Sequence, residues 1–175
     1  MSKKIYLLAG HNGKGSGASG FIDEGEEAIV LRDLVAKYIT KEVVKDQNGT
    51  KLPDIIKWLT PIVQNDSLLI EIHFDASETA SANGSTIVID DNSNAVEKDI
   101  AAKFNTAICD TLKVKNRGIW KASQTPHKVL GVLRYPKCNN VLIEVCFCTN
   151  KEDVAKYITK KELLAKAIAK VINEY

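Results

Sequence analysis

Residues 67–77 read Ser-Leu-Leu-Ile-Glu-Ile-His-Phe-Asp-Ala-Ser, and the apolar part of this stretch, residues 68–74, contains two ionisable side chains. Residues 68–74 have the length and apolar character of a strand inside a sheet, and the polar residues from Asp75 favour a turn. Because side chains alternate along a strand, Glu71 and His73 share one face. A buried ionisable group must be hydrogen-bonded, paired or bound to a metal. His73 is therefore a candidate site residue, with a core histidine bonded to a backbone carbonyl as the simpler alternative.

The composition predicts one ordinary globular domain over residues 1–175. Hydrophobic residues make up 45% of the chain and charged residues 26%, values typical of a folded single domain. The 24 basic and 22 acidic residues leave a net charge of +2, which indicates neither nucleic acid nor an anionic membrane as a partner. No apolar run approaches the roughly 20 residues that span a bilayer.

The N-terminus and the cysteines together predict synthesis in the cytoplasm. The apolar run at residues 5–9 is too short for a signal peptide. Four cysteines are present, with no CxxC pair among them: Cys109, Cys138, Cys146 and Cys148. Reduced thiols that pack in the core are the expected state, and a zinc–thiolate site is the alternative.

A second histidine also follows a predicted strand. Residues 5–9 read as a buried strand, and Gly10-His11-Asn12-Gly13 ends it in residues suited to a tight turn. The Gly- and Ser-rich segment that follows, residues 13–20, lacks the spacing of a phosphate-binding loop. His11 therefore joins His73 as a candidate at a strand end.

A helix is predicted over residues 24–39, with acidic residues in its first turn. Counted from Glu27, the positions three, four, seven, eight and eleven residues on carry Val30, Leu31, Leu34, Val35 and Tyr38, which form one apolar stripe. This phase places Glu27 on the buried face. Glu24 and Glu26 are then expected to face water and interact with the helix dipole.

The remaining pattern alternates strands with helices. Strands are predicted at residues 85–89 and 141–147, with a short edge strand near 43–44 and further short apolar stretches at 119–120 and 129–133. Helices are predicted at 53–63, 94–112 and after Asn150 and Thr159. This alternation predicts a single-domain α/β fold: a twisted, mostly parallel but mixed sheet of about six strands, with helices on both faces.

The strand at residues 141–147 contains one carboxylate, Glu144, in an otherwise apolar run. Open α/β sheets place their functional sites at the carboxyl ends of strands, so Glu144 and Glu27 can meet His11 and His73 there. Two imidazoles and one carboxylate are a known catalytic zinc set, and a further carboxylate can act as the base. Because no compact HExxH motif is present, the spacing alone is a moderate signal.

The same residues resemble the Amidase_3 family of zinc-dependent N-acetylmuramoyl-L-alanine amidases over nearly the whole chain. Ala-Gly-His11-Asn-Gly is similar to the first ligand motif, the acidic start of the next helix to the second, and Glu-Ile-His73-Phe-Asp-Ala-Ser to the third. The segment around Glu144 resembles the one that carries the catalytic glutamate. Asp75 and Cys146 depart from the residues that the family commonly has, Asn and Gly.

The resemblance implies a peptidoglycan hydrolase. Zn²⁺ held by His11, Glu27 and His73 would activate water, and Glu144 would act as general base in cleaving the amide between the lactyl group of N-acetylmuramic acid and L-alanine of the stem peptide. Alternatives are a zinc peptidase or deacetylase acting on another amide, or a non-catalytic wall-binding module. Glu71 is either a partner that orients a ligand or part of a strand salt bridge to a lysine, and His127 either faces solvent or contacts substrate.

With neither a signal peptide nor a wall-binding module, the sequence resembles a minimal phage or prophage endolysin. We expect a monomer that is made in the cytoplasm, acts on the cell wall after release, and needs no nucleic acid or membrane partner.

Overall fold

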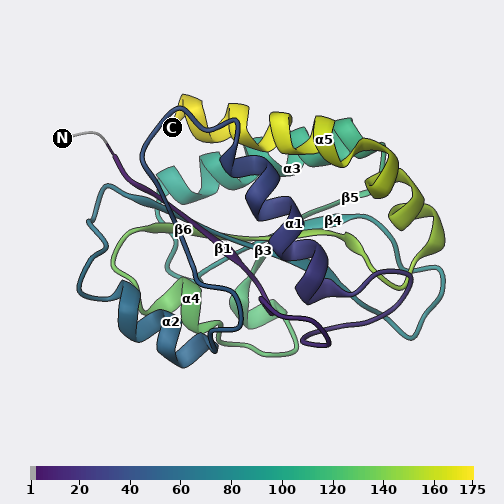
Figure 1. The fold of residues 1–175 in the computed structure, drawn as a ribbon, viewed down its shortest axis with the longest axis horizontal. Helices are drawn as coiled ribbons and strands as arrows, with labels where there is room; N and C mark the ends of the chain where they lie inside the picture. The colour runs from purple at the N-terminus through teal and green to yellow at the C-terminus, as the bar shows by residue number, and fades with distance from the viewer. Residues whose placement is uncertain (1–2) are drawn as a thin grey trace.

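The computed structural model describes residues 3–175, which form one mixed six-stranded sheet with helices on both faces (Figure 1). The strands are β1 (Ile5–Ala9), β2 (Val43–Lys45), β3 (Leu68–Asp75), β4 (Ser85–Ile89), β5 (Asn116–Lys121) and β6 (Asn139–Phe147). The helices are α1 (Glu24–Ala36), α2 (Leu52–Leu59), α3 (Ala95–Leu112), α4 (Gly131–Arg134) and α5 (Lys151–Glu174), with a short 3-10 turn at Ala122–Gln124. The predicted fold class is confirmed.

Four neighbouring strands run parallel and two run the other way. The order across the sheet is β2-β1-β3-β6-β4-β5. Strands β2, β1, β3 and β6 are mutually parallel, β4 is antiparallel to β6, and β5 is parallel to β4. The carboxyl ends of β1, β3 and β6 therefore lie at one edge of the sheet, where a site is expected.

Helices α1, α3 and α5 cover one face of the sheet, and α2 and α4 cover the other (Figure 1). Each face has its own apolar cluster, because strand side chains alternate between faces. On β3, Ile70 and Ile72 belong to the larger cluster and Leu69 to the smaller one. Glu71 and His73 share the parity of Leu69, so they face α2 and α4.

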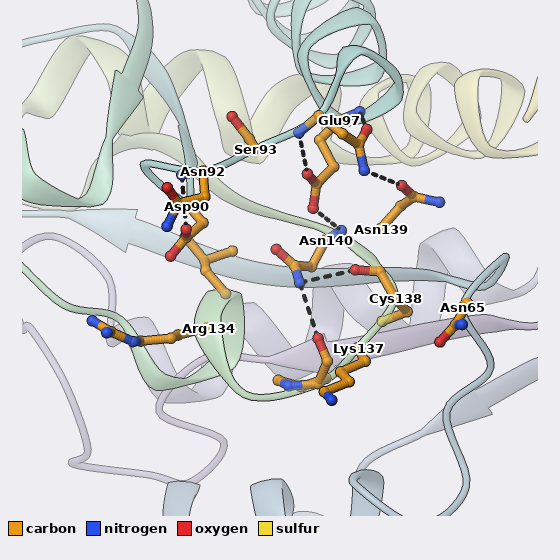
Figure 2. Close-up of a pocket in the computed structure, with 13 residues that line it drawn as sticks. Asn65, Asp90, Asn92, Ser93, Glu97, Arg134, Lys137, Cys138, Asn139 and Asn140 are labelled. Atoms are coloured by element: carbon orange, nitrogen blue, oxygen red, sulfur yellow. Dashed lines mark hydrogen bonds between the residues drawn. The ribbon is translucent and has the colours of Figure 1, made fainter.

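The helix starts agree only partly with the sequence. The predicted capping box of α3 is present, since Asn94 accepts from the backbone N–H of Glu97 and the Glu97 carboxylate accepts from that of Asn94. The same carboxylate accepts from the backbone N–H of Asn140 on β6 (Figure 2). The predicted start at Thr159 is wrong, because α5 continues through it and the Thr159 hydroxyl donates to the Ala155 carbonyl one turn back. Within residues 3–175, no helix has both the length and the hydropathy to cross a membrane.

Candidate metal centre

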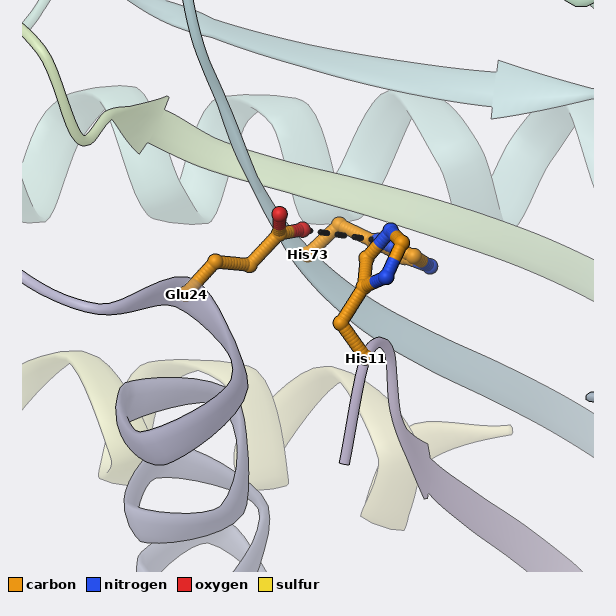
Figure 3. Close-up of side chains that lie close together, drawn as sticks. All are labelled: His11, Glu24 and His73. Carbon is orange, nitrogen blue, oxygen red and sulfur yellow. Dashed lines mark hydrogen bonds and ion pairs between the residues drawn. The ribbon is translucent and has the colours of Figure 1, made fainter. Parts of the chain in front are cut away.

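Three side chains from separate elements converge at the carboxyl edge of the sheet: His11, Glu24 and His73 (Figure 3). One potential ligand atom from each lies within 4.8 Å of the others. His73 Nδ1 lies 3.0 Å from Glu24 Oε1, and the two imidazole rings are 5.3 Å apart at 87°. The prediction that His11 and His73 meet at strand ends is confirmed.

A buried polar network fixes the turn that carries His11. His11 has a φ of 49°, a left-handed conformation that is uncommon outside glycine. Asp46, just after β2, accepts from Ala9 N at 3.2 Å and from Asn12 Nδ2 at 2.5 Å. Arg32 of α1 donates to the same carboxylate at 2.8 Å. The residues on both sides of His11 are thereby anchored to β2 and α1.

Gly10 and Gly25 have no side chain at positions where other residues of the site pack against their backbone. A Cβ on Gly10 would lie 2.2 Å from His73 Cε1, so the imidazole packs directly on the Gly10 backbone. A Cβ on Gly25 would lie 2.1 Å from the carbonyl oxygens of His11 and Gly13. The start of α1 therefore packs tightly against the His11 turn.

Glu24, rather than the predicted Glu27, lies beside the histidines. Glu24 is the first residue of α1 and is 3% exposed, and its carboxylate also accepts from the backbone N–H groups of Ala18 and Phe74. The Glu27 carboxylate points instead to α5, where it accepts from Tyr157 Oη at 2.8 Å and Lys161 Nζ at 2.9 Å. The Glu27 assignment is therefore corrected to Glu24.

The physical reason is the phase of α1. Besides Gly25, its buried positions are Glu24, Ala28, Leu31, Arg32 and Val35, which recur at the four-, seven-, eight- and eleven-residue spacing of one helix face when counted from Glu24. Val30, which the predicted phase buried, is 38% exposed. Glu26 is exposed, as predicted.

Glu144 lies on β6 directly beside His73. The two residues are register partners in the β3–β6 pair, and Thr86 of β4 is the partner of Glu144 on its other side. Glu144 Oε2 is buried and has no hydrogen-bond partner among residues 3–175. Burial raises the pKa of Glu144 to about 8, against the lowering effect of nearby His73. A buried carboxyl group that titrates near neutrality suits general acid–base chemistry.

Glu24 and His73 strongly shift each other's pKa values. Burial alone would raise the pKa of Glu24, but the hydrogen bond and charge of His73 bring it below its usual value. Burial alone would lower the pKa of His73, but the carboxylates of Glu71, Glu24 and Glu144 hold it well above its usual value. Such mutual shifts are common where charged groups are gathered for function.

All of these groups open into a cavity of about 920 Å³ on the α2 and α4 side of the sheet. Its lining includes His11, Glu24, His73 and Glu144, together with Trp120 and His127. His127 is exposed, which agrees with both roles predicted for it. The four cysteines are free thiols, and they are not part of the metal-ligand cluster that residues 3–175 contain.

The sequence profile described as Amidase_3, N-acetylmuramoyl-L-alanine amidase, matches residues 5–174. The chain belongs to this family. An uncharacterised protein of Clostridium perfringens is 33% identical to this Amidase_3 chain over 186 residues, covering 98% of the chain and 52% of that protein. The N-acetylmuramoyl-L-alanine amidase LytC of Bacillus subtilis is 30% identical over 164 residues, covering 89% of the chain and 32% of LytC. The chain thus spans about half of the first relative and a third of the second.

Solved structures agree with the Amidase_3 fold. An N-acetylmuramoyl-L-alanine amidase of Clostridium difficile 630 has a TM-score of 0.84 at 20% identity, covering 99% of this chain and 96% of that one. The catalytic domain of an endolysin that targets Clostridia difficile has a TM-score of 0.72 at 26% identity, covering 99% and 98%.

Proposed function

We propose that this chain hydrolyses the amide bond between the lactyl group of N-acetylmuramic acid and L-alanine in peptidoglycan, and that it does so as a zinc enzyme. One observation carries the proposal: Glu144 lies beside the His11, Glu24 and His73 cluster and lines the same cavity. Family membership supplies the substrate class.

The three side chains fit zinc by their chemistry. Two imidazoles and one carboxylate form a donor set of catalytic zinc sites that keep an open position. One potential ligand atom from each side chain lies within 4.8 Å of the others, and Glu24 is a buried carboxylate, which needs a compensating partner. A zinc ion bound there would supply the Lewis acidity that activates water and polarises the substrate carbonyl. His11, Glu24 and His73 would hold it.

Glu144 is the group that we expect to move the protons. As general base it takes one proton from the attacking water while the new C–O bond forms, and as general acid it returns this proton to the alanine nitrogen as the C–N bond breaks. Burial holds the pKa of Glu144 at about 8, close enough to neutral pH for the same carboxyl group both to accept and to donate a proton.

The test is to digest purified cell wall and identify the products. Amidase cleavage releases a peptide with a free L-alanine amine and leaves the muramic acid with a free lactyl carboxylate, whereas a peptidase or a deacetylase generates other new ends. Glu144→Gln should fold and keep zinc but lose about 10²- to 10⁴-fold in rate. Near-normal cleavage by this variant would contradict the assigned role of Glu144.

We further propose that the protein acts on the cell wall as a monomer after release from the cytoplasm where it is made. Its 26% identity to the catalytic domain of an endolysin supports this setting. Light scattering of the purified protein tests whether it is a monomer. Comparing the lysis of cells that express it with and without a membrane pore tests whether it must be released from the cytoplasm. Lysis without the pore would contradict the proposed route.

A further inference from the structure

Glu71 is a buried carboxylate that the mechanism above does not use. It lies on β3 two residues before His73, on the same face, and is 5% exposed. Its register partners on the neighbouring strands are Leu8 and Leu142, both apolar and buried. Burying a carboxylate among such neighbours is costly unless a partner compensates for the lost hydration.

The partner of Glu71 is His73. Glu71 Oε2 lies 3.0 Å from His73 Nε2, and no other ion pair or hydrogen bond of the Glu71 side chain occurs within residues 3–175. The predicted alternative of a strand salt bridge to a lysine is therefore not the arrangement found. The Nε2 atom lacks a well-aligned hydrogen-bond acceptor in the described chain, so the contact is a close ionic approach.

The two ring nitrogens of His73 thus face different carboxylates. Nδ1 lies 3.0 Å from Glu24 Oε1, on the side of the metal-ligand cluster, while Nε2 faces Glu71. A metal-bound histidine usually donates its second ring N–H to a carboxylate or carbonyl, which fixes the tautomer and the ring orientation. We propose that Glu71 is a positioning residue that keeps the Nε2 proton of His73 and so presents Nδ1 to the metal. This inference rests on the zinc site proposed above.

A role in stability alone predicts a different result. Removing one partner of a buried pair is usually destabilising, but His73 keeps the carboxylates of Glu24 and Glu144 beside it, and isoleucine suits a buried strand. Glu71→Ile should therefore still fold, and it should lose more zinc affinity than Glu71→Gln, which removes the same charge. A purely structural role would leave the zinc affinity of the folded protein the same in both variants.

The experiment compares zinc affinity, by competition with a chromophoric chelator, in the wild type, Glu71→Ile and Glu71→Gln. We expect Glu71→Ile to bind zinc about 10- to 100-fold more weakly. Glu71→Gln should lose less, because its amide oxygen can still accept from Nε2–H. Glu27→Gln is the matched control: its carboxylate lies three residues further along the same helix as Glu24 but contacts Tyr157 and Lys161, so its affinity should stay at the wild-type value.

A second readout is independent of activity. In the zinc-loaded wild type, ¹⁵N spectra should place the zinc on Nδ1 of His73 and show a slowly exchanging Nε2 proton, which Glu71→Ile should lose. Wild-type zinc affinity in Glu71→Ile, or zinc bound through Nε2, would overturn the proposal. A wild type that binds zinc normally but does not cleave peptidoglycan would count against the proposed reaction and leave the role of Glu71 intact.

Discussion

Glu24 and Glu27 are one helical turn apart on α1, but their contacts assign them different roles. Glu24 contacts His73 and lies in the metal-ligand cluster, while Glu27 contacts α5. Glu24→Gln should therefore lose its bound zinc, because a neutral amide is a poor zinc ligand, and Glu27→Gln should retain about one zinc per chain. Metal analysis of the two purified variants compares them directly. Zinc loss in Glu27→Gln alone would instead support Glu27 as the zinc ligand, as the sequence predicted.

The sequence pointed to three of the four residues of the candidate site, His11, His73 and Glu144 but not Glu24, for a physical reason. Ionisable residues at strand ends or within apolar strands are unusual, and His11, His73 and Glu144 each stand out in that way. Glu24 does not, because acids in the first turn of a helix are common and ordinarily interact with the dipole in water. Only its position at the start of the Ala28, Leu31 and Val35 stripe distinguished it from Glu26.

Gly10 provides a second test at the residue scale. A methyl group there would lie 2.2 Å from His73 Cε1, which forces the imidazole out of the cluster. Gly10→Ala should lower zinc affinity and cost roughly 1–3 kcal/mol of stability through overpacking. Zinc titration and thermal unfolding measure the two effects. Gly13→Ala is the control, since its nearest neighbour would lie at 3.9 Å, and equal behaviour of the two variants would contradict the assigned packing.

Among the elements, α1, β2 and the turn after β1 are joined by one buried ion pair. Arg32 and Asp46 are paired at 2.8 Å with side chains 3% and 0% exposed. Because Arg32→Met leaves the Asp46 carboxylate buried and short of a partner, it should lower the free energy of unfolding by about 3–5 kcal/mol. Urea titration measures this loss.

The control is an ion pair on the surface of α3. Lys103 and Asp99 are 2.7 Å apart and more than half exposed, so Lys103→Met should cost only about 0.3–0.5 kcal/mol. A similarly small loss in Arg32→Met would show that the buried network is not needed for stability.

The elements themselves were easier to predict than their ends. The strands predicted at residues 5–9, 85–89 and 141–147 are apolar runs of the right length. The structure has a strand at each of these places, and the last one begins two residues earlier, at Asn139. The internal Thr159 and Glu162 imitate a capping box, but Tyr157 before them and Leu164 and Ile168 after them are buried on one face of α5, which continues as a single helix. Local capping signals yield to a long apolar face packed on the sheet.

At the scale of the whole molecule, β4 and β5 run opposite to β6 and supply the wall of the cavity next to Glu144. Because β4 is antiparallel to β6, Thr86 comes to lie beside Glu144, and Trp120 of β5 reaches the cavity lining. The sequence predicted a mixed sheet, but the order of its strands depends on pairings between distant segments that no local pattern encodes. The walls of the cavity therefore could not be assigned before the fold was known.

The buried thiols predict how the stability of the whole molecule changes at high pH. Burial raises the pKa of Cys109 from 9.0 to about 11 and that of Cys138 from 9.0 to about 12. Above about pH 9 the unfolded chain therefore loses thiol protons that the folded protein keeps, and the free energy of unfolding falls as the pH rises towards 11 to 12. The two buried thiols therefore make their full contribution to the free energy of unfolding only below about pH 9.

We expect urea unfolding under reducing conditions to show this loss as a lower free energy at pH 10.5 than at pH 8. The Cys109→Ala/Cys138→Ala variant lacks both thiols, so its stability should fall less over the same interval, even if its stability at pH 8 is lower because the substitutions leave small cavities. The informative quantity is thus the change with pH, since the cavity cost is the same at both values. Equal changes in the wild type and the variant would show that deprotonation of these two thiols does not contribute.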